Sequence, residues 1–377
     1  MNFSKKAMGI GFPFVNLQNI FGNNVIDVSN LGKAMASDSQ LKDYNLLNGD
    51  VLFVRSSVKL EGVGEAALVP QTLDNTTYSG FIIRFRDEYG LDNNFKRFVF
   101  GIESVRNQIM SQATNSANKN ISQSVLENLE LAIPSKSEQQ KIGAYFSNLD
   151  HLITLHQRKY DKLVMSKKSM LEKMFPKNGQ TKPEIRFSGF IDDWEQRKLG
   201  ELGTITTGNT PSTSIPDYYS DDGIVWVTPT DICENITFES ARKLSDLGQQ
   251  VGRVVPKNTI LVTCIASIGK NTMLGNTGSF NQQINGLTPN ENKYDPYFLL
   301  TESALWSAKM KGSAAAGTMQ IVNRTEFSEL KTWLPSLIEQ QAIGAFFKQL
   351  DHLITLHQRE LEKLKKIKLS MLEKMFV

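Results

Sequence analysis

Two short segments contain residues of the kind that enzymes use to bind phosphate or metal. Ser267–Asn271 ends like a phosphate-binding loop, with a glycine and a lysine side by side. Cys264 stands where that motif requires its first glycine, and no serine or threonine follows Lys270, so we reject a nucleotide site. Glu291 and Lys293 have the spacing of the end of a nuclease motif, but the sequence offers no acidic partner at a suitable spacing. We interpret this pair as a charged turn.

A third segment, Asp295-Pro296-Tyr297-Phe298, is similar to the Asp-Pro-Pro-Tyr motif with which amino-methyltransferases hold a flipped adenine. One proline is missing, and no glycine-rich cofactor loop precedes the segment. A proline is well tolerated in the first turn of a helix, because its missing N–H would have no partner there. The segment is therefore predicted to begin a helix and not to bind a base.

All four histidines lie in two repeated segments: His151, His156, His352 and His357. Within each segment they are five residues apart, which is not the i, i+4 spacing of a helical metal site, so no metal ligands are predicted. The two cysteines, Cys233 and Cys264, form neither a CxxC pair nor a disulfide framework, which indicates a reducing, cytoplasmic setting. With so few candidate bases and nucleophiles, we expect the chain to bind rather than to catalyse.

The overall composition is that of an ordinary globular protein. The chain has 377 residues, of which 40% are hydrophobic and 21% are charged, so extensive disorder is excluded. At roughly 150 residues per domain, this length predicts two domains, or three. No apolar run reaches the ~18 residues of a membrane span, and the N-terminal residues lack the apolar core of a secretory signal. The net charge of +3 permits nucleic-acid binding but does not indicate it.

An internal repeat organises the chain. Residues 138–175 and 339–376 match at 27 of 38 positions, without a gap and at an offset of 201 residues. A period of this length is too long for a solenoid, so it indicates a unit of one globular domain and one helix that is used twice. Ser135 and Ser336, each followed three residues later by a glutamate, form capping boxes at the predicted helix starts, and Pro176 ends the first helix. The repeats carry the excess of basic residues. These residues could lie near phosphates, bind an acidic partner or form helix faces that are exposed to solvent.

Apolar residues recur in both repeats at alternating steps of four and three, which is the 3.5-residue period of a coiled coil. Lys167 and Lys368 interrupt this seam at matching places. Neither helix can bury such a seam alone, so we predict that the two pair antiparallel, with His156 and His357 fixing the register. The predicted helix–helix interface comprises Ile142, Phe146, Leu149, Ile153, His156, Tyr160, Leu163, Met170 and Met174 in the first helix, and Ile343, Phe347, Leu350, Ile354, His357, Leu361, Leu364, Met371 and Met375 in the second.

The segments before these helices contain short runs of β-forming residues separated by Gly, Asn and Pro, which predicts mixed α/β domains. Gly11–Val15 lines up with Gly223–Val227, and Asp50–Val54 lines up with Thr259–Thr263, so the two domains share a skeleton. The predicted fold class is α+β, with two such domains joined by an antiparallel coiled coil in a pseudo-twofold repeat. The predicted boundaries are 1–135 for the first domain, 136–176 for its helix, 177–184 for a linker, 185–335 for the second domain and 336–377 for its helix.

The repeated helix start, Pro-Ser-x-x-Glu-Gln-Gln-x-Ile-Gly, and the two unlike domains before it resemble the specificity (S) subunit of type I restriction-modification systems. The resemblance covers essentially the whole chain. The doubled helix motif is specific, whereas the domains alone would be a weaker signal. The second half also carries the other motifs of the family: Trp194–Leu202, Thr207–Ser212, Ser267–Gly269, Phe280–Ile284 and Gly317–Ile321.

This resemblance implies a DNA-recognition protein that is not itself an enzyme. In the family, each domain is a target-recognition domain that reads one half of a split, asymmetric site in double-stranded DNA, and the paired helices act as a ruler between the halves. The helices are also expected to dock two methyltransferase (M) subunits, which methylate adenine with S-adenosylmethionine. Restriction (R) subunits, which use ATP and Mg, complete the nuclease. The resemblance implies that this chain binds no cofactor itself and has no membrane partner.

The first domain departs from the family pattern. In the second domain, the residues from Trp194 to Asp222 precede the strand that begins at Gly223, whereas only ten residues precede the matching strand at Gly11. About thirty family-typical residues, including the Gly-x-Thr-Pro loop, are therefore expected to be missing from the first domain, as in a truncated or recombined allele or after a misassigned start codon.

Base edges are read by Arg, Lys, Asn, Gln, Ser and Thr side chains on loops, while lysines and backbone amides hold phosphates. Tyr218 and Tyr219 could stack on a displaced base, although packing in a sheet is the favoured interpretation. We predict DNA contacts from Arg55, Ser56, Ser57, Lys59, Asn115, Asn118, Lys119 and Asn120 in the first domain, and from Thr207, Asn209, Thr210, Ser212, Ser267, Lys270, Asn281, Gln282, Gln283, Lys311, Thr318 and Gln320 in the second.

Two other interpretations stay open. A structural coiled-coil adaptor without DNA contact would show no sequence-dependent DNA binding. A silent or truncated allele would assemble with its partners without productive DNA recognition. An autonomous nuclease or methyltransferase is disfavoured by the incomplete motifs described above.

Overall fold

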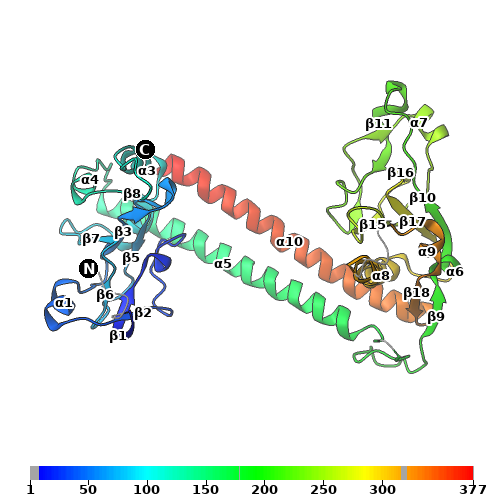
Figure 1. Cartoon of the computed structure of the whole chain (residues 1–377), viewed down its shortest axis with the longest axis horizontal. Helices are drawn as coiled ribbons and strands as arrows, with labels where there is room; N and C mark the ends of the chain where they lie inside the picture. The colour runs from blue at the N-terminus through cyan, green and yellow to red at the C-terminus, as the bar shows by residue number, and fades with distance from the viewer. Residues whose placement is uncertain (1–7, 178, 316–320, 377) are drawn as a thin grey trace. The chain divides into compact units, whose positions relative to one another are not determined.

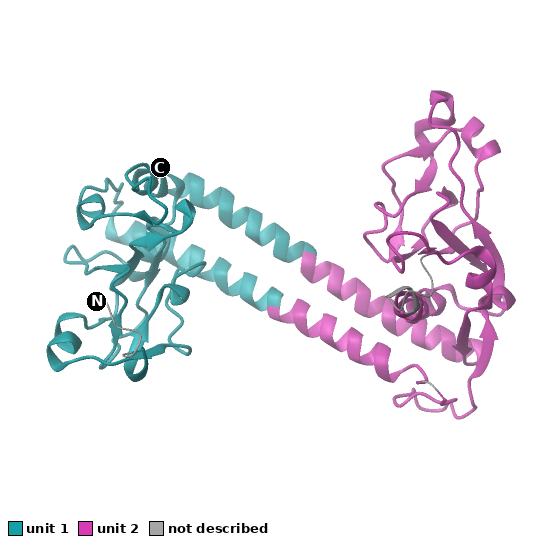
Figure 2. Ribbon diagram, in the orientation of Figure 1, with its two compact units in different colours: residues 1–157, 359–377 teal, residues 158–358 magenta. Residues whose placement is uncertain are grey.

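The structure, a computed structural model, describes residues 8–177, 179–315 and 321–376. The chain divides into two compact units: unit 1 comprises residues 1–157 and 359–377, and unit 2 comprises residues 158–358 (Figure 2). The division falls within two long helices, α5 (Lys136–Lys173) and α10 (Leu337–Met375), which are labelled in Figure 1. Each unit therefore contains one α/β domain together with half of each long helix.

The described strands of unit 1 are β1 (Met8–Val15), β2 (Gly32–Ala34), β3 (Val51–Val54), β4 (Ser56–Ser57), β5 (Ala66–Leu68), β6 (Thr77–Tyr78), β7 (Ile82–Phe85) and β8 (Lys119–Asn120). They form sheets of order β2-β1-β6, β5-β3-β7 and β4-β8. All four residues of β3 are apolar and buried, as expected for a short strand covered on both faces. The described α-helices of the domain are α1 (Asp38–Asp43), α2 (Asn93–Val99), α3 (Glu103–Ser111) and α4 (Gln123–Glu127).

The described strands of unit 2 are β9 (Glu195–Lys198), β10 (Gly203–Thr207), β11 (Tyr219–Val227), β12 (Ile236–Thr237), β13 (Lys243–Leu244), β14 (Ile260–Thr263), β15 (Asn271–Leu274), β16 (Gly278–Phe280), β17 (Ile284–Pro289) and β18 (Lys331–Leu334). They form sheets of order β10-β17-β14-β15-β12, β13-β11-β16 and β18-β9. The described α-helices of the domain are α6 (Leu199–Leu202), α7 (Asp246–Val251), α8 (Pro296–Ala315) and α9 (Arg324–Glu329).

The two domains share the skeleton that the sequence alignment predicts. β1 pairs antiparallel with β2 and parallel with β6, and β11 pairs in the same way with β13 and β16. β3 lies between two antiparallel neighbours, β5 and β7, just as β14 lies between β15 and β17. Unit 2 has an additional strand, β10, on the outer edge of β17. The predicted α+β class with an internal repeat is confirmed.

The long helices pack against each other within each unit. In unit 1, the ring of Phe146 in α5 lies 5.7 Å from that of Phe376, directly after α10. In unit 2, the ring of Phe175, directly after α5, lies 6.0 Å from that of Phe347 in α10. In both units, higher residue numbers on one helix meet lower numbers on the other, so the pair is antiparallel as predicted. The two lysines that interrupt the apolar seam form ion pairs across the helices. Lys368 Nζ lies 2.6 Å from the Asp150 carboxylate, and Lys167 Nζ lies 2.5 Å from the Asp351 carboxylate.

One predicted seam residue is placed differently. Met375 is 36% exposed at the end of α10, whereas Phe376 packs on the core of unit 1. The heptad pattern fails here because the helix ends at Met375, so the following residue no longer continues the helical period and turns inward. The equivalent residues at the end of α5, Met174 and Phe175, are both buried.

The Glu-Gln-Gln-x-Ile-Gly repeat acts as a latch between each long helix and its domain. In unit 1, the buried Gln139 accepts a hydrogen bond from the backbone N–H of Asp92 at 3.0 Å and donates one to the Pro134 carbonyl at 2.9 Å. In unit 2, Gln340 accepts from the backbone N–H of Asp295 and donates to the Pro335 carbonyl at the same two distances. The motif therefore ties the start of α5 to α2 and the start of α10 to α8.

The glycine of the latch allows the close approach. A Cβ on Gly143 would lie 2.7 Å from the backbone nitrogen of Phe95, and a Cβ on Gly344 would lie 3.0 Å from that of Phe298. The second latch has an additional ion pair, because Arg186 binds the buried Glu339 carboxylate through two hydrogen bonds of 2.7 and 2.8 Å. Each long helix is thus fixed to the first turn of the helix that it crosses.

Candidate nucleic-acid interface

In unit 1, the structure brings together two predicted DNA-contact segments that are far apart in the sequence. Ser56 pairs with Asn120 and Ser57 with Lys119 in the antiparallel β4–β8 ladder. The backbone N–H of Ile121 also donates to the Arg55 carbonyl at 3.0 Å. The loop after the central strand β3 and the loop before α4 therefore form one surface.

This surface presents cations and amides. The side chains of Arg55, Lys59, Asn115 and Asn118 are exposed, and Lys119 Nζ donates to Asn115 Oδ1 at 3.1 Å. A hollow of about 550 Å³ opens beside them. Its lining is mixed, and includes the polar residues Ser56, Ser57, Lys59, Glu61, Glu65 and Asn118 and the apolar residues Leu17, Phe21, Val58 and Phe81. Such a surface can hold phosphates with its cations and contact base edges with its amides.

In unit 2, the early loop after β10 is held by hydrogen bonds from several of the predicted residues. Thr207 Oγ1 donates to Asn285 Oδ1 at 2.6 Å, and Thr210 Oγ1 donates to Gln282 Oε1. Asn209 uses both ends of its amide, because its Nδ2 donates to the Val251 carbonyl and its Oδ1 accepts from the backbone N–H of Arg253, both at 2.8 Å. Ser212 is exposed and bonds Ser214 at 2.7 Å. Asn209 therefore shapes this loop, while Ser212 remains accessible.

The loop after the central strand β14 lies against α8. Gly269 has a φ of 82° and stands so close to α8 that a Cβ would meet Lys311 at 2.7 Å and Ser307 at 3.1 Å. Ser267 and Lys270 on this loop are exposed, and Lys270 Nζ donates to the Pro229 carbonyl at 3.0 Å. The loop and Lys311 thus form one basic edge of unit 2.

The turn between β16 and β17 is adjacent to both loops. Asn281 is buried and donates to Gln283 Oε1 at 3.0 Å, whereas Gln282 is exposed. The Gln283 carbonyl accepts from the backbone N–H of Cys264 at 2.8 Å, which joins the turn to the end of β14. Thr318 and Gln320 lie outside the described residues.

The same main-chain contact underlies the surface in both units. In unit 1, the backbone N–H of Ile121 donates to the carbonyl of Arg55, the first residue after β3. In unit 2, the backbone N–H of Val322 donates at 3.0 Å to the carbonyl of Cys264, the first residue after β14. The two domains therefore share an equivalent backbone arrangement of these two loops, which we call the platform, and they differ in the side chains that the loops carry.

Arg253 belongs to this region but was not among the predicted residues. Its guanidinium is exposed and donates to the Thr207 carbonyl at 2.6 Å, while its backbone holds Asn209. Its position in the sequence, between α7 and a buried strand, gave no signal because its partners are about 45 residues away. Tyr219 packs in the sheet, with its ring 6.0 Å from Trp226 and its hydroxyl bonded to the Pro211 carbonyl.

The residues of the predicted helix–helix interface differ in their degree of burial. The buried ones are Ile142, Phe146, Leu149, Ile343, Phe347, Leu350 and Leu361. Those of intermediate burial are Ile153, His156, Tyr160, Leu163, Ile354, His357 and Leu364. Met174 at the end of the first helix is also buried, and Met170 and Met371 are of intermediate burial. Most of the buried seam residues therefore lie near the start of each helix, where a domain also covers the seam, and Leu361 and Met174 are the exceptions.

The enzyme-like segments have structural roles in unit 2. Asp295 Oδ1 accepts the backbone N–H of Phe298 at 2.7 Å, which caps α8, and the Tyr297 hydroxyl donates to Asp351 on α10 at 3.0 Å. Burial raises the pKa of the Cys264 thiol to about 11, so the thiol stays protonated and unreactive near neutral pH. The predicted helix that begins at Pro296 is confirmed.

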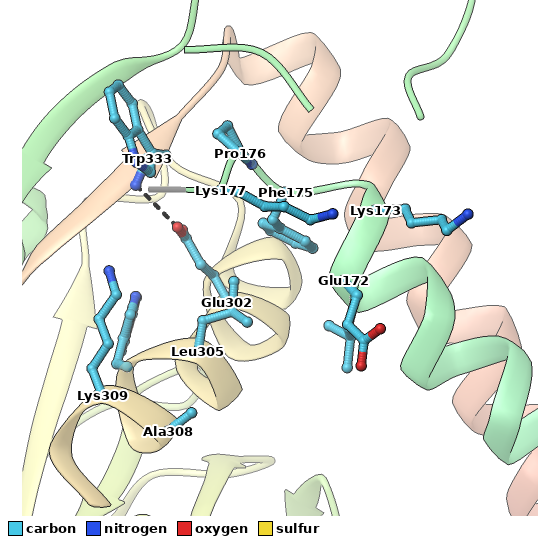
Figure 3. Close-up of a pocket in the computed structure, with 12 residues that line it drawn as sticks. Glu172, Lys173, Phe175, Pro176, Lys177, Glu302, Leu305, Ala308, Lys309 and Trp333 are labelled. Carbon is cyan, nitrogen blue, oxygen red and sulfur yellow. Dashed lines mark hydrogen bonds between the residues drawn. The ribbon is translucent and has the colours of Figure 1, made fainter. Parts of the chain in front are cut away.

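A hollow of about 490 Å³ lies between the end of α5, helix α8 and β18, away from these loops (Figure 3). Glu302 on α8 is buried in its wall and accepts the backbone N–H of Trp333 at 3.0 Å through Oε1, drawn as the dashed line in Figure 3. Glu302 Oε2 has no hydrogen-bond partner among the described residues. Burial raises the pKa of Glu302 to about 8, so this carboxyl group is mostly protonated at neutral pH.

The described residues contain no group of three or more His, Cys, Asp and Glu side chains arranged to hold a metal ion. None of the helices in the described part of the chain combines the length and the apolar character that crossing a bilayer requires.

Comparison with known proteins gives a consistent family. The model of the family described as "Type I restriction modification DNA specificity domain" matches residues 1–165 and 191–366. The chain is 23% identical over 374 residues to the putative type I restriction enzyme MjaX specificity subunit of Methanocaldococcus jannaschii, covering 95% of this chain and 85% of the relative. It is 28% identical over 197 residues to the MjaIX specificity subunit of the same organism, covering 49% of this chain and 44% of the relative.

A solved structure shows the same fold. The crystal structure of the S subunit of a type I restriction-modification system from M. genitalium superposes with a TM-score of 0.65, at 15% identity, over all of this chain and 92% of the other. The likeness includes both domains and the long helices, since it extends over the full length of the chain.

Proposed function

This chain belongs to the family of type I restriction-modification DNA specificity subunits, which are non-catalytic, and on that premise we propose that its two domains read the two halves of a split, asymmetric DNA site. The domains are residues 1–135 and 185–335, with a linker at 177–184 between the first long helix and the second domain. Each domain reads DNA through the loop after its central strand and the loop before its last short helix.

The observation that carries this proposal is the equivalent platform in both units. The same main-chain contact, from Ile121 to Arg55 and from Val322 to Cys264, joins the same two loops twice. Different side chains then stand on it, with Arg55, Lys59 and Asn118 in unit 1, and Ser267 and Lys270 in unit 2. A shared platform with unlike side chains suits two half-sites of unlike sequence.

The partners follow from the family. We propose that the long helices and their latches dock two methyltransferase subunits, and that restriction subunits join this core in the cytoplasm. S-adenosylmethionine, ATP and Mg would be bound by those partners. The chain itself would determine which DNA sequence the complex recognises and the spacing between the half-sites.

The test is methylome sequencing of cells that express the chain with a methyltransferase subunit. We expect one split motif with two specified halves. Replacing Arg55 and Lys59 by alanine should weaken or relax one half only, and replacing Ser267 and Lys270 should affect the other. Lys42→Ala, at an exposed position on α1, is the matched control and should leave the motif unchanged.

Three outcomes would contradict the proposal or part of it. DNA binding without sequence preference, together with normal assembly, would favour a structural adaptor. A motif with only one specified half that the Arg55 and Lys59 substitutions leave unchanged would show that the first domain is silent. Loss of both halves from a substitution in one unit would show that the domains do not read independently.

A further inference from the structure

Several loops of unit 2 leave its five-stranded sheet at the same end. β10 ends at Thr207, which pairs with Asn285 at the start of β17, and β14 ends at Thr263, which pairs with Ile284. Arg253 joins this end of the sheet, because its Nη1 donates to the Thr207 carbonyl at 2.6 Å. We call the surface formed here the reading edge, and it comprises residues 207–212, 253 and 281–283.

The side-chain amide oxygens of the reading edge all accept hydrogen bonds from within the protein. Asn209 Oδ1 accepts a backbone N–H at 2.8 Å, and Gln282 Oε1 accepts from Thr210 Oγ1. Asn281 Oδ1 accepts from the backbone N–H of Gln283 at 3.1 Å, and Gln283 Oε1 accepts from Asn281 Nδ2 at 3.0 Å. None of these amides therefore has its oxygen free to accept from a ligand.

Donor groups on the same edge are left over. The Nε2 groups of Gln282 and Gln283 donate to no atom among the described residues. Arg253 uses one N–H of its exposed guanidinium on a backbone carbonyl, and it has no acidic partner in the described part of the chain. Arg186 and Arg197, by contrast, each bind a glutamate carboxylate. The reading edge therefore offers donors to a ligand.

A set of donors matches one base better than the others. In the major groove guanine presents two acceptors, N7 and O6, whereas adenine presents an acceptor and a donor and cytosine presents a donor. The planar guanidinium of an arginine can give two parallel hydrogen bonds to N7 and O6, which is the commonest specific contact between a protein and a base. Phosphate oxygens are acceptors as well, so the experiment has to separate a base contact from a phosphate contact.

A chain of hydrogen bonds holds Arg253 in place. Thr207, whose carbonyl binds Arg253, donates through Oγ1 to Asn285 Oδ1 at 2.6 Å. Asn285 is only 2% exposed and donates through Nδ2 to the Val322 carbonyl at 3.1 Å. Val322 belongs to the platform, since its N–H donates to the Cys264 carbonyl. A side chain that is fixed before binding loses less conformational freedom on binding, which favours selective recognition.

This chain of hydrogen bonds is specific to unit 2. Asn285 pairs with Val262 of β14, and the equivalent position in unit 1 is Ile83, which pairs with Phe53 of β3. An isoleucine side chain can form neither of the two hydrogen bonds that Asn285 makes. The support of the reading edge therefore differs between the units, as two unlike half-sites require.

We propose that Arg253 selects guanine in the half-site that unit 2 reads, by donating hydrogen bonds to N7 and O6 in the major groove. Thr207 and Asn285 keep the guanidinium in position for this contact. The inference rests on the proposed function and adds the identity of one base pair to it.

The first experiment is methylome sequencing of cells that express the full chain with its methyltransferase subunit. The half-site of unit 2 is the half that changes when Ser267 and Lys270 are replaced, and we expect it to contain a G·C pair. Arg253→Ala should raise methylation of sites with another base at that position by about tenfold or more, and should leave the other half unchanged. Arg197→Ala is the matched control, because Arg197 is an exposed arginine that precedes β10, whereas Arg253 contacts the last residue of β10.

The second experiment measures the affinity of the purified complex for duplexes with a modified guanine. The base 7-deazaguanine lacks the N7 acceptor but pairs normally, and it should weaken binding of the wild type by about tenfold. Inosine keeps N7 and O6 and should bind like guanine. Arg253→Ala should bind guanine and 7-deazaguanine equally, which isolates the contact as a double-mutant cycle does. Arg253→Lys keeps the charge without the planar fork, so it should retain overall affinity and lose most of the selectivity.

Three results would overturn the inference while leaving the proposed function intact. They are a unit 2 half-site without a G·C pair, an equal loss of affinity of Arg253→Ala for all sequences, which would indicate a phosphate contact, and an unchanged effect of 7-deazaguanine in Arg253→Ala. A complex without any sequence preference would overturn the proposed function and this inference together.

Discussion

The ammonium group of Lys368 lies 2.6 Å from the carboxylate of Asp150, across the paired helices of unit 1. Its repeat equivalents, Lys167 and Asp351, make the same contact in unit 2 at 2.5 Å. The two lysines occupy the places where the apolar seam is interrupted, so each polar break has an acidic partner in the antiparallel register. A polar seam position with one matching partner specifies register more than it adds stability.

Charge reversal at this break should destabilise unit 1. Lys368→Glu would place a second carboxylate beside Asp150, and we expect the free energy of unfolding to fall by about 1 kcal/mol, because the site is partly screened by solvent. Lys366→Glu, at an exposed position on the same helix, is the control. Denaturant unfolding that shows equal effects for the two variants would mean that the ion pair does not contribute.

The aromatic contact at the start of α5 should be far more important for stability. Phe146 is fully buried between Phe98, at 5.2 Å, and Phe376. Phe146→Ala should lower the free energy of unfolding by about 3–5 kcal/mol, because it leaves a cavity in the core. The neighbouring Tyr145 is 38% exposed, so Tyr145→Ala should cost much less in the same unfolding measurement. Similar losses for both variants would contradict this assignment of the core.

Unit 2 should lose stability as the pH rises, because burial raises the pKa of Glu302 from 4.5 to about 8. The folded state keeps its proton where the unfolded state has released it, so the stabilisation that Glu302 contributes is fully present below about pH 4.5 and is lost as the pH rises to about 8. The slope approaches about 1.4 kcal/mol per pH unit for one group. Urea unfolding between pH 5 and 8 measures it.

Glu302→Gln should remove this pH dependence, because the amide does not titrate. Glu172→Gln is the matched control, since Glu172 lines the same hollow but is exposed (Figure 3). If the pH dependence is the same in wild type and Glu302→Gln, another group is responsible.

The early loop of unit 2 should depend on Asn209 for its shape. Asn209→Ala removes hydrogen bonds to the Val251 carbonyl and to the Arg253 N–H, which should cost about 1–2 kcal/mol in the free energy of unfolding. Ser212→Ala changes an exposed hydroxyl and should leave unfolding unaffected. A loss of DNA affinity in Ser212→Ala without a loss of stability would assign Ser212 to DNA contact, and an unaltered stability of Asn209→Ala would contradict the structural role.

Local and periodic features of this fold could be predicted from the sequence, whereas contacts between distant segments could not. The long helices could be predicted from a heptad pattern that occurs twice in the sequence. The central strands could be predicted from apolar runs such as Val51–Val54. The pairing of Ser57 with Lys119 depends on tertiary register, for which neither segment carries a local signal. Arg253 was missed for the same reason. Glu302 was missed because a glutamate within a helix is usually exposed, and only the packing of α8 shows that it is buried.

The latch has a consequence for the inheritance of these domains. Gln139 and Gln340 are bound through main-chain groups of the domains, and Gly143 and Gly344 make room for main-chain atoms. The part of the attachment that the glutamine and the glycine make therefore depends on the presence of a helix start at one place, and not on the loops that the domain presents to DNA. Mutation can therefore change the loops of one domain without changing how that domain is attached to its long helix. New surface residues can arise while the fold that supports them stays the same.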